Sequence, residues 1–295
     1  MGSWDEILDE VNGMESSQDY IRHKYISSLS DLTGRNTITY YSGWLGKPNA
    51  YNVDINDNDM NGIMNCVHGL DCSKGLDLIL HTPGGSPAAA EAIVYYLRNK
   101  FSNDIRVIVP QLAMSAGTMI ACSAKTIIMG IQSSLGPIDP QFDGIPAYNI
   151  KSEFEEAKQD LLDNPDNVRY WGIKLQQYPA AFMKSAIDAI EISGKLVYEW
   201  LGSCMFDNSI ETDRKIVSNI VSKLNEHENS KIHNRHYNSE FCKSIGLKIE
   251  MMEESDSLQD AILSLHHAYM ITFSCTKAVK IIENNKGKSA IAFAK

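Results

Sequence analysis

Three short apolar runs form the clearest pattern in the chain: LDLILH (76–81), IRVIVP (105–110) and TIIMG (126–130). Each run is continuous and does not alternate with polar residues, which is typical of strands buried on both faces. Between them, residues 86–101 and 116–124 have apolar positions at helical spacing. This order of strand, helix, strand, helix and strand requires right-handed parallel crossovers and predicts an α/β domain.

The segment before this pattern is predicted to begin with a helical arm. Residues 3–30 have helical periodicity with a break near Gly13, and 36–44 has the β-branched and aromatic content of a strand. We therefore divide this half of the chain into a helical arm, 1–34, and an α/β core, 35–150.

The second half of the chain is predicted to be largely helical. Charged helical faces follow one another from about residue 151, and breaks are expected at Pro165 and Pro179. The last residues, 286–295, are predicted to be frayed. We interpret 151–295 as a helical region that follows this core. Two further helices are predicted within it, over 211–226 and 256–274.

Composition narrows the class of protein. The 295 residues are 43% apolar, which is enough for one large core or two modest ones, and they carry a net charge of −10. This acidity argues against a nucleic-acid partner, because phosphate binding needs a basic surface. The apolar runs are too short to span a membrane, and the acidic N-terminus does not have the composition of a signal peptide. None of the six cysteines forms a CxxC pair, which favours a reduced, cytoplasmic protein.

Two turns that follow the first two apolar strands carry the candidate chemistry: HTPGGSP (81–87) and PQLAMSAGT (110–118). Both lie beyond the carboxyl ends of parallel strands, where ligands bind in open sheets. Ser115 begins a helix, whose N-terminal amides favour developing negative charge. With backbone N–H donors from Ala116 and Gly85, this serine has the layout of a nucleophile with an oxyanion hole.

A purely structural interpretation of the same residues stays open at this point. Pro-Gly-Gly turns are common, and serine is a favoured helix N-cap for local reasons. The Gly-x-Ser-x-Gly nucleophile elbow is not met because Ala113 replaces the first glycine, and no phosphate-binding loop or metal-binding motif occurs.

Taken together, LDLILHTPGG, AMSAGTMIACSAKTIIMG and SSLGPIDPQF, in this order, resemble the serine dehydrogenase proteinase family. This family is a distant relative of the Clp protease proteolytic subunit and of signal peptide peptidase A. The YYSGW, QYPAAF and AIEISGKLV segments also resemble it. The resemblance implies a Clp/crotonase-like fold and a serine peptidase that needs no cofactor and no metal. It also implies that 35–150 is the catalytic core and that the helical region 151–295 covers the site and mediates assembly.

The resemblance also implies roles for individual residues. Ser115 is expected as the nucleophile, with Gly84, Gly85, Ala116 and Gly117 around the oxyanion and the substrate. The family's triad has the chain order Ser, Asp, His, and the acid is then the aspartate of GPIDPQ, residue 139.

The identity of the base is left open. His233 best matches the histidine that this family has upstream of the GLKI segment, and His236 is its near rival. The Clp enzymes have a histidine close to the position of Asp139, whereas this chain has none between His81 and His227. His81, His266 and His267 are expected to be core or capping residues.

A Ser–Lys dyad, as in signal peptide peptidase A, is the alternative mechanism. Lys151, Lys158 and Lys174 are its candidates, although solvated positions on charged helices are the simpler interpretation. Lys125 is expected at the far end of the helix that Ser115 begins.

The expected partners follow from this chemistry. A peptide or protein is the expected substrate, and a homo-oligomer is the expected assembly. A separate ATPase or adaptor chain would have to supply any unfolding, since the chain has no ATPase motif. Two other functions stay open: a crotonase-like acyl-thioester enzyme, and a non-catalytic Clp-fold assembly protein.

Overall fold

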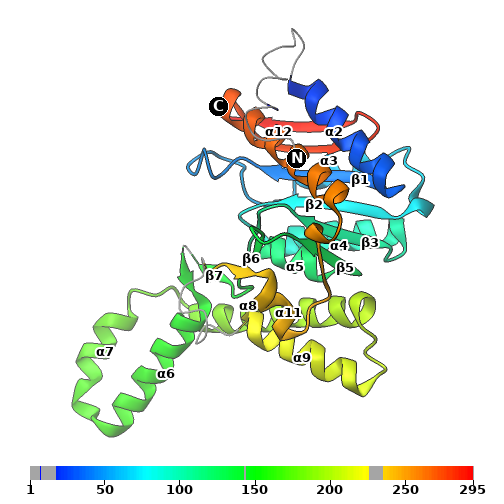
Figure 1. Ribbon diagram of the computed structural model, residues 1–295. Coiled ribbons are helices and arrows are strands. Elements are labelled where there is room, and N and C mark those ends of the chain that lie inside the picture. The colour runs from blue at the N-terminus through cyan, green and yellow to red at the C-terminus, as the bar shows by residue number, and fades with distance from the viewer. Residues whose placement is uncertain (1–6, 8–17, 143, 226–234, 295) are drawn as a thin grey trace.

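The structure is a computed structural model that describes residue 7 and residues 18–142, 144–225 and 235–294. Its largest element is a seven-stranded sheet with the order β10-β5-β3-β2-β1-β11-β12 (Figure 1). Strands β1, β2, β3, β5 and β10 are parallel, whereas β11 and β12 are antiparallel to their neighbours. The strands predicted from the apolar runs are confirmed. The bounds are β1 Asn36–Ser42, β2 Leu76–His81, β3 Ile105–Val109, β5 Thr126–Met129, β10 Ile249–Met251, β11 Ala278–Asn284 and β12 Ser289–Phe293.

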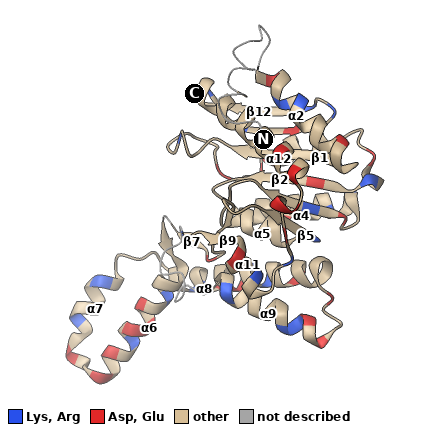
Figure 2. Ribbon diagram, viewed as in Figure 1, with Lys and Arg blue, Asp and Glu red and all other residues tan. Residues whose placement is uncertain are grey.

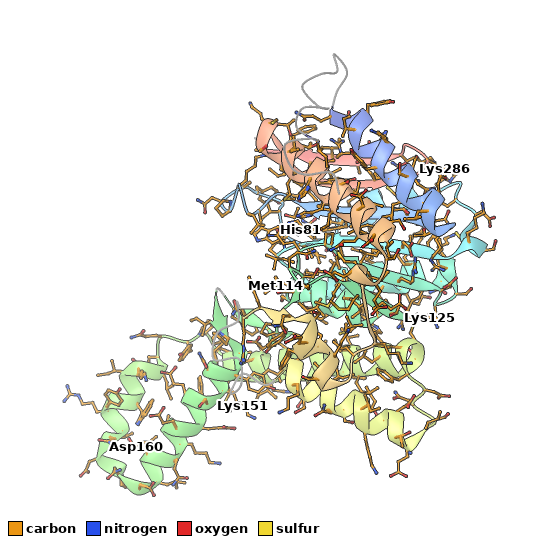
Figure 3. All side chains as sticks on the ribbon, in the orientation of Figure 1. His81, Met114, Lys125, Lys151, Asp160 and Lys286 are labelled. Carbon is orange, nitrogen blue, oxygen red and sulfur yellow. The ribbon has the colours of Figure 1, made fainter. Side chains whose placement is uncertain are left out.

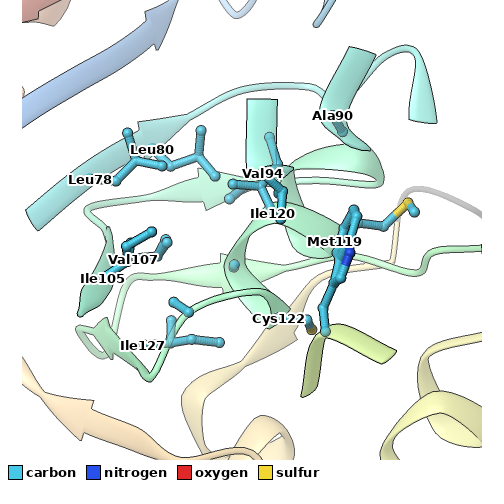
Figure 4. Close-up of a cluster of buried hydrophobic side chains, with 14 of the residues drawn as sticks. Leu78, Leu80, Ala90, Val94, Ile105, Val107, Met119, Ile120, Cys122 and Ile127 are labelled. Carbon is cyan, nitrogen blue, oxygen red and sulfur yellow. The ribbon is translucent and has the colours of Figure 1, made fainter. Parts of the chain in front are cut away.

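Helices cover both faces of this sheet, and the predicted α/β class is confirmed. Leu78 and Leu80 of β2 point into the core under α4 and α5 (Figure 4), and Ile79 between them points to the opposite face, toward α12. Side chains on both faces are therefore buried, which explains why the strands are continuously apolar. The helices of these layers are α2 Gln18–Thr33, α3 Asp59–Val67, α4 Pro87–Phe101, α5 Ala116–Cys122 and α12 Asp256–Cys275, with short 3-10 turns at η1 Cys72–Lys74 and η4 Met252–Glu254.

The second half of the chain adds a helical region below the sheet. Here α8 packs against α5 and α9, while α6 and α7 project from the body (Figure 1). Charged side chains lie along α6, α7 and α9 (Figure 2). The breaks predicted at Pro165 and Pro179 are confirmed, because Pro165 begins the 3-10 turn between α6 and α7, and Pro179 lies between α7 and α8. The elements are β7 Gln141–Phe142, β8 Ile145–Pro146, α6 Ala147–Asp163, η2 Pro165–Asn167, α7 Val168–Leu175, α8 Phe182–Trp200, η3 Leu201–Met205, α9 Glu211–Asn225 and α11 Ser239–Ile245.

The end of the chain differs from the prediction. Strand β11 occupies the sheet position beside β1, and β12 pairs with β11 through a tight turn in which Gly287 has a φ of 79°. The predicted fraying of 286–295 is therefore wrong, and 151–295 is not helical throughout. Strand β11 was not predicted, because two of its residues, Lys280 and Glu283, are charged side chains that are buried and paired with residues far away in the sequence.

The predicted arm can be followed only in part. Helix α2 matches the second half of the helix predicted over 3–30, and the break predicted at Gly13 lies outside the described residues. The boundaries 1–34, 35–150 and 151–295 stay a prediction. Among the described helices, none combines the length and the apolar character that crossing a bilayer requires.

Candidate active site

A small second sheet joins the segments that carry the predicted site residues. Its strands are parallel where β4 pairs with β6, with Ala113 opposite Leu135, and antiparallel where β9 pairs with β6, with Tyr237 opposite Leu135. The carboxyl ends of β4 and β6 and the amino end of β9 therefore lie at one edge of this sheet. The bounds are β4 Leu112–Ala113, β6 Ser134–Leu135 and β9 Tyr237–Asn238.

The predicted nucleophile, acid and one candidate base all leave this sheet at the same edge. Ser115 comes two residues after β4, Asp139 comes four residues after β6, and His236 directly precedes β9. Segments that are far apart in the sequence thus converge in space without needing to belong to the large sheet. Sequence patterns could not have found this arrangement, because two-residue strands have no detectable periodicity.

Ser115 has an unusual backbone conformation. Its φ is 51° and its ψ is −117°, in a region that non-glycine residues rarely occupy and that costs about 1–3 kcal/mol. The side chain is half-buried and caps no amide of α5. The interpretation of this serine as an ordinary N-cap therefore loses its physical basis, since the strain is not offset by a capping hydrogen bond.

Gly84 allows the two candidate turns to touch. Its φ is 102°, and a Cβ atom on it would lie 2.7 Å from both the carbonyl oxygen of Met114 and the Cβ atom of Ser115. The same Cβ atom would lie 3.2 Å from the amide nitrogen of Ala116. Any side chain at position 84 would therefore displace the segment that holds Ser115.

Gly85 is held from one side by a short extended segment. Ile55 donates its N–H to the carbonyl of Gly84 at 2.7 Å and accepts the N–H of Ser86 at 2.8 Å. A Cβ atom on Gly85 would lie 2.4 Å from the backbone of Ile55, so only glycine fits. In such a parallel bridge both bonds come from the neighbours of Gly85, and its own N–H and C=O point away from Ile55.

The four predicted oxyanion and substrate residues differ in what their amides do. The N–H of Gly84 donates to the Thr82 hydroxyl, and the N–H of Gly117 donates to the Met114 carbonyl. Within the described chain, the N–H groups of Gly85 and Ala116 make no backbone hydrogen bond. Of the four amides, these two can donate to a ligand.

Thr118 is a positioning residue that sequence reasoning missed. Its buried hydroxyl donates to the carbonyl of Ala113 at 2.8 Å and accepts the N–H of Gly136 at 2.9 Å. It thereby fixes the start of the segment that leads to Asp139 against α5. A threonine one turn into a small-residue helix carries no sequence signal for this role.

Asp139 is buried beside the last turn of α9. It is 1% exposed, and the preceding Ile138 donates its N–H to the carbonyl of Leu224 at 2.9 Å. His236 is exposed, directly before β9, and His233 lies outside the described residues. The structure therefore places the candidate acid and one candidate base at the same edge as Ser115.

The candidate lysines are paired with glutamates, exposed to solvent, or far from Ser115. Lys151 lies 3.7 Å from Glu155, and Lys174 lies 2.6 Å from Glu153, both within the projecting α6 and α7. Lys158 is exposed on α6. Figure 3 shows Lys125 at the other end of the strands from Met114, the residue before the nucleophile.

His81 and His266 face away from the candidate nucleophile, into the core on the α12 side of the sheet. Their ring centroids lie 5.3 Å apart, and His81 also packs on Tyr41 and Trp44. Burial, with the neighbouring His266, holds the pKa of His81 well below its usual range, and burial lowers the pKa of His266 to about 3. Both are therefore neutral core residues at pH 7, as expected from the sequence.

Among the described residues, no three His, Cys, Asp or Glu side chains come together as a metal site. The arrangement instead offers a hydroxyl on a strained residue beside two unused amides. Such a site can attack a carbonyl and stabilise the resulting oxyanion.

Comparison with known proteins agrees with this geometry. The chain is 36% identical over 148 residues to the uncharacterized protein MJ0137 of Methanocaldococcus jannaschii, covering 48% of this chain and 51% of that protein. It is 33% identical over 120 residues to MJ1495 of the same organism, covering 41% and 40%. The matched region thus spans about half or less of these relatives. The family described as ClpP-like SDH-type serine proteinases matches residues 20–168, and the chain belongs to this family.

Proposed function

We propose that the chain is a serine peptidase that hydrolyses peptide bonds through Ser115. The observation that carries the proposal is the strained conformation of this residue, whose φ of 51° persists without a capping hydrogen bond. Strain of this kind is retained where the surrounding structure over-determines it, and it concentrates at active sites. The family is one of serine proteinases, which supports the same reaction class.

The proposed reaction starts with attack of Ser115 Oγ on the carbonyl carbon of the substrate, while a histidine accepts the hydroxyl proton. The N–H groups of Gly85 and Ala116 stabilise the oxyanion, and the histidinium then returns the proton to the leaving amine. Water then attacks the carbonyl carbon of the acyl-enzyme while the histidine accepts a proton from it, and the histidinium returns this proton to Ser115 Oγ as the ester bond breaks. Asp139 holds the histidine and stabilises its charged form. This chemistry requires no cofactor.

The proposed base is His233 or His236. The position of His236 directly before β9, at the edge from which Ser115 and Asp139 also leave, supports a base from this part of the chain. The Ser–Lys dyad has less support, because Lys151 and Lys174 are half-exposed and already paired with glutamates. Separate alanine substitutions of the two histidines would identify the base by loss of turnover.

A fluorophosphonate probe tests the proposal directly. The wild-type protein should be labelled and Ser115→Ala should not. Ser255→Ala is a matched control, because Ser255 also begins a helix, but with a φ of −140° and with its hydroxyl accepting the N–H of Leu258. Equal labelling of the wild type and Ser115→Ala would disprove the assignment of the nucleophile.

The proposal extends to partners. Protein substrates, a homo-oligomer, a cytoplasmic location and a separate ATPase or adaptor chain fit a Clp-fold peptidase. Assembly is supported by apolar side chains on the projecting α6 and α7, since Leu162 is 69% exposed, Val168 63% and Ile173 61%. The test of assembly is the molar mass of the purified protein in solution, compared between the wild type and a variant in which these three side chains are changed to serine.

Two alternatives give different outcomes in the same assays. A crotonase-like acyl-thioester enzyme needs the two amides but no nucleophilic serine, so Ser115→Ala would keep thioester activity. A non-catalytic Clp-fold assembly protein would neither label nor cleave peptides. The strained backbone of Ser115 favours the peptidase over both.

A further inference from the structure

A buried ion pair contacts the backbone of residues 54–56, the segment that is hydrogen-bonded to the turn containing Gly85. Lys280 Nζ lies 2.7 Å from Asp59 Oδ1, and the two side chains are 3% and 4% exposed. The hydroxyl of Tyr40 donates to the other carboxylate oxygen of Asp59 at 2.7 Å. Removing two charges from water is expensive, so a pair buried this deeply needs further hydrogen bonds to persist.

Those further bonds go to the two residues on either side of Ile55. Lys280 Nζ donates to the carbonyl of Asp54 at 2.6 Å, and the N–H of Asn56 donates to Asp59 Oδ2 at 3.0 Å. Ile55 itself, fully buried, makes its two backbone bonds with the carbonyl of Gly84 and the N–H of Ser86 on the opposite side.

This alternation is the hydrogen-bonding pattern of an extended strand between two neighbours. One edge of the 54–56 segment is bound to the ion pair, and the other edge is bound to the Pro-Gly-Gly turn. Both edges are thereby fixed, and Gly85 cannot turn its N–H without breaking bonds on Ile55.

We infer that Lys280 and Asp59 are positioning residues that hold the Gly85 amide in its donating orientation through the 54–56 segment. The inference rests on the proposed function, in which that amide stabilises the oxyanion. Neither residue touches the substrate, and their effect passes through Ile55. Hydrogen-bond donors stabilise the oxyanion effectively only when their orientation is fixed before the reaction. Greater mobility of the Gly85 N–H would therefore lower the rate of the chemical step.

The chain offers a matched control on the same strand. Arg22 pairs with Glu283 at 2.8 Å, with both side chains 1% exposed, and the hydroxyl of Tyr269 donates to Glu283 at 2.7 Å. This pair therefore also combines a cation, a carboxylate and a tyrosine in the core. It has no bond to the 54–56 segment.

The test compares Asp59→Leu/Lys280→Met with Arg22→Met/Glu283→Leu. Both double variants remove a whole buried pair, which avoids leaving one charge alone. Hydrogen exchange of the Ile55 and Ser86 amides should become about tenfold faster or more in the first variant and stay unchanged in the second.

The kinetic measurement uses peptide hydrolysis well below the melting temperature of each variant. Asp59→Leu/Lys280→Met should lower kcat about tenfold with little change in KM, since a misplaced donor affects mainly the transition state. Arg22→Met/Glu283→Leu should keep the wild-type kcat. Exchange and kcat equal to those of the control variant would overturn the inference.

The two proposals fail in distinguishable ways. If the chain is not a serine hydrolase, the wild type is not labelled by the fluorophosphonate, yet the exchange measurement still reports whether the ion pair holds the 84–86 turn. If the wild type is labelled and both variants are labelled at its rate, the positioning role is refuted and the peptidase stands.

Discussion

Replacing Gly84 by alanine should damage the site, because the new methyl group would lie between the two turns that form it. At a φ of 102° a left-handed alanine costs about 1–2 kcal/mol, from the clash of its Cβ with the backbone. The new methyl would lie 2.7 Å from the carbonyl of Met114 and from the Cβ of Ser115, and overpacking of this kind costs about 1–3 kcal/mol. We therefore expect Gly84→Ala to lose about 2–5 kcal/mol of unfolding free energy.

Relief of this contact must move Ser115 or the Pro-Gly-Gly turn. A displacement of about 1 Å between reacting groups can cost about 100-fold in rate, so fluorophosphonate labelling of Gly84→Ala should slow by about that factor. Urea unfolding and the labelling rate measure the two effects separately.

Gly287 supplies the control for backbone strain alone. Its φ is 79°, but an added Cβ would meet nothing within 4 Å. Gly287→Ala should therefore lose only about 1–2 kcal/mol and keep the wild-type labelling rate. If Gly84→Ala is labelled as fast as Gly287→Ala, the packing of the two turns does not position the nucleophile, and the reasoning is wrong.

Three further predictions concern stability. The pKa of His266 is about 3 in the folded protein, and that of His81 is also lowered, so protons bind more readily to the unfolded chain. Unfolding free energy should therefore fall below pH 6.5 by about 1.4 kcal/mol per pH unit from His266, and further from His81, measured by urea titration. Glu283→Gln removes the buried carboxylate from Arg22, which keeps only the exposed Asp19 as a charged partner, and should cost up to about 3–5 kcal/mol by the same measurement. Thr118→Val leaves the buried N–H of Gly136 without an acceptor. It should lower the unfolding free energy by about 1–3 kcal/mol and slow fluorophosphonate labelling.

Specific outcomes would contradict the predictions for the two histidines and for Thr118. A flat unfolding free energy between pH 6.5 and 4.5 would mean that His81 and His266 are not buried as neutral groups. For Thr118, the exposed Thr212 of α9 gives the control, since its change to valine should alter neither stability nor labelling. Equal effects of the two threonine substitutions would remove the positioning role of Thr118.

The large parallel sheet and its helices could be predicted from the sequence, because strands buried on both faces carry a continuous apolar signal. The location of Ser115 and Gly85 at strand ends followed from the same pattern. Strand β11 could not, since Lys280 and Glu283 look solvated until their partners, 221 and 261 residues away, are known. Ile55 was missed for a similar reason, because it is a fully buried residue inside a polar Asn/Asp-rich loop.

Strand β11 lies near the end of the chain, so it is synthesised after the residues of the candidate site. This order affects when the oxyanion hole can form. Domains form from the N-terminus during synthesis, so the Pro-Gly-Gly turn and Ser115 emerge long before residue 280. Until then β1 has an open edge, and Asp59 has no lysine to pair with. If the ion pair orients the Gly85 amide, a nascent chain carries the nucleophile without a competent oxyanion hole. In that case the oxyanion hole becomes competent only when β11 has joined the sheet beside β1.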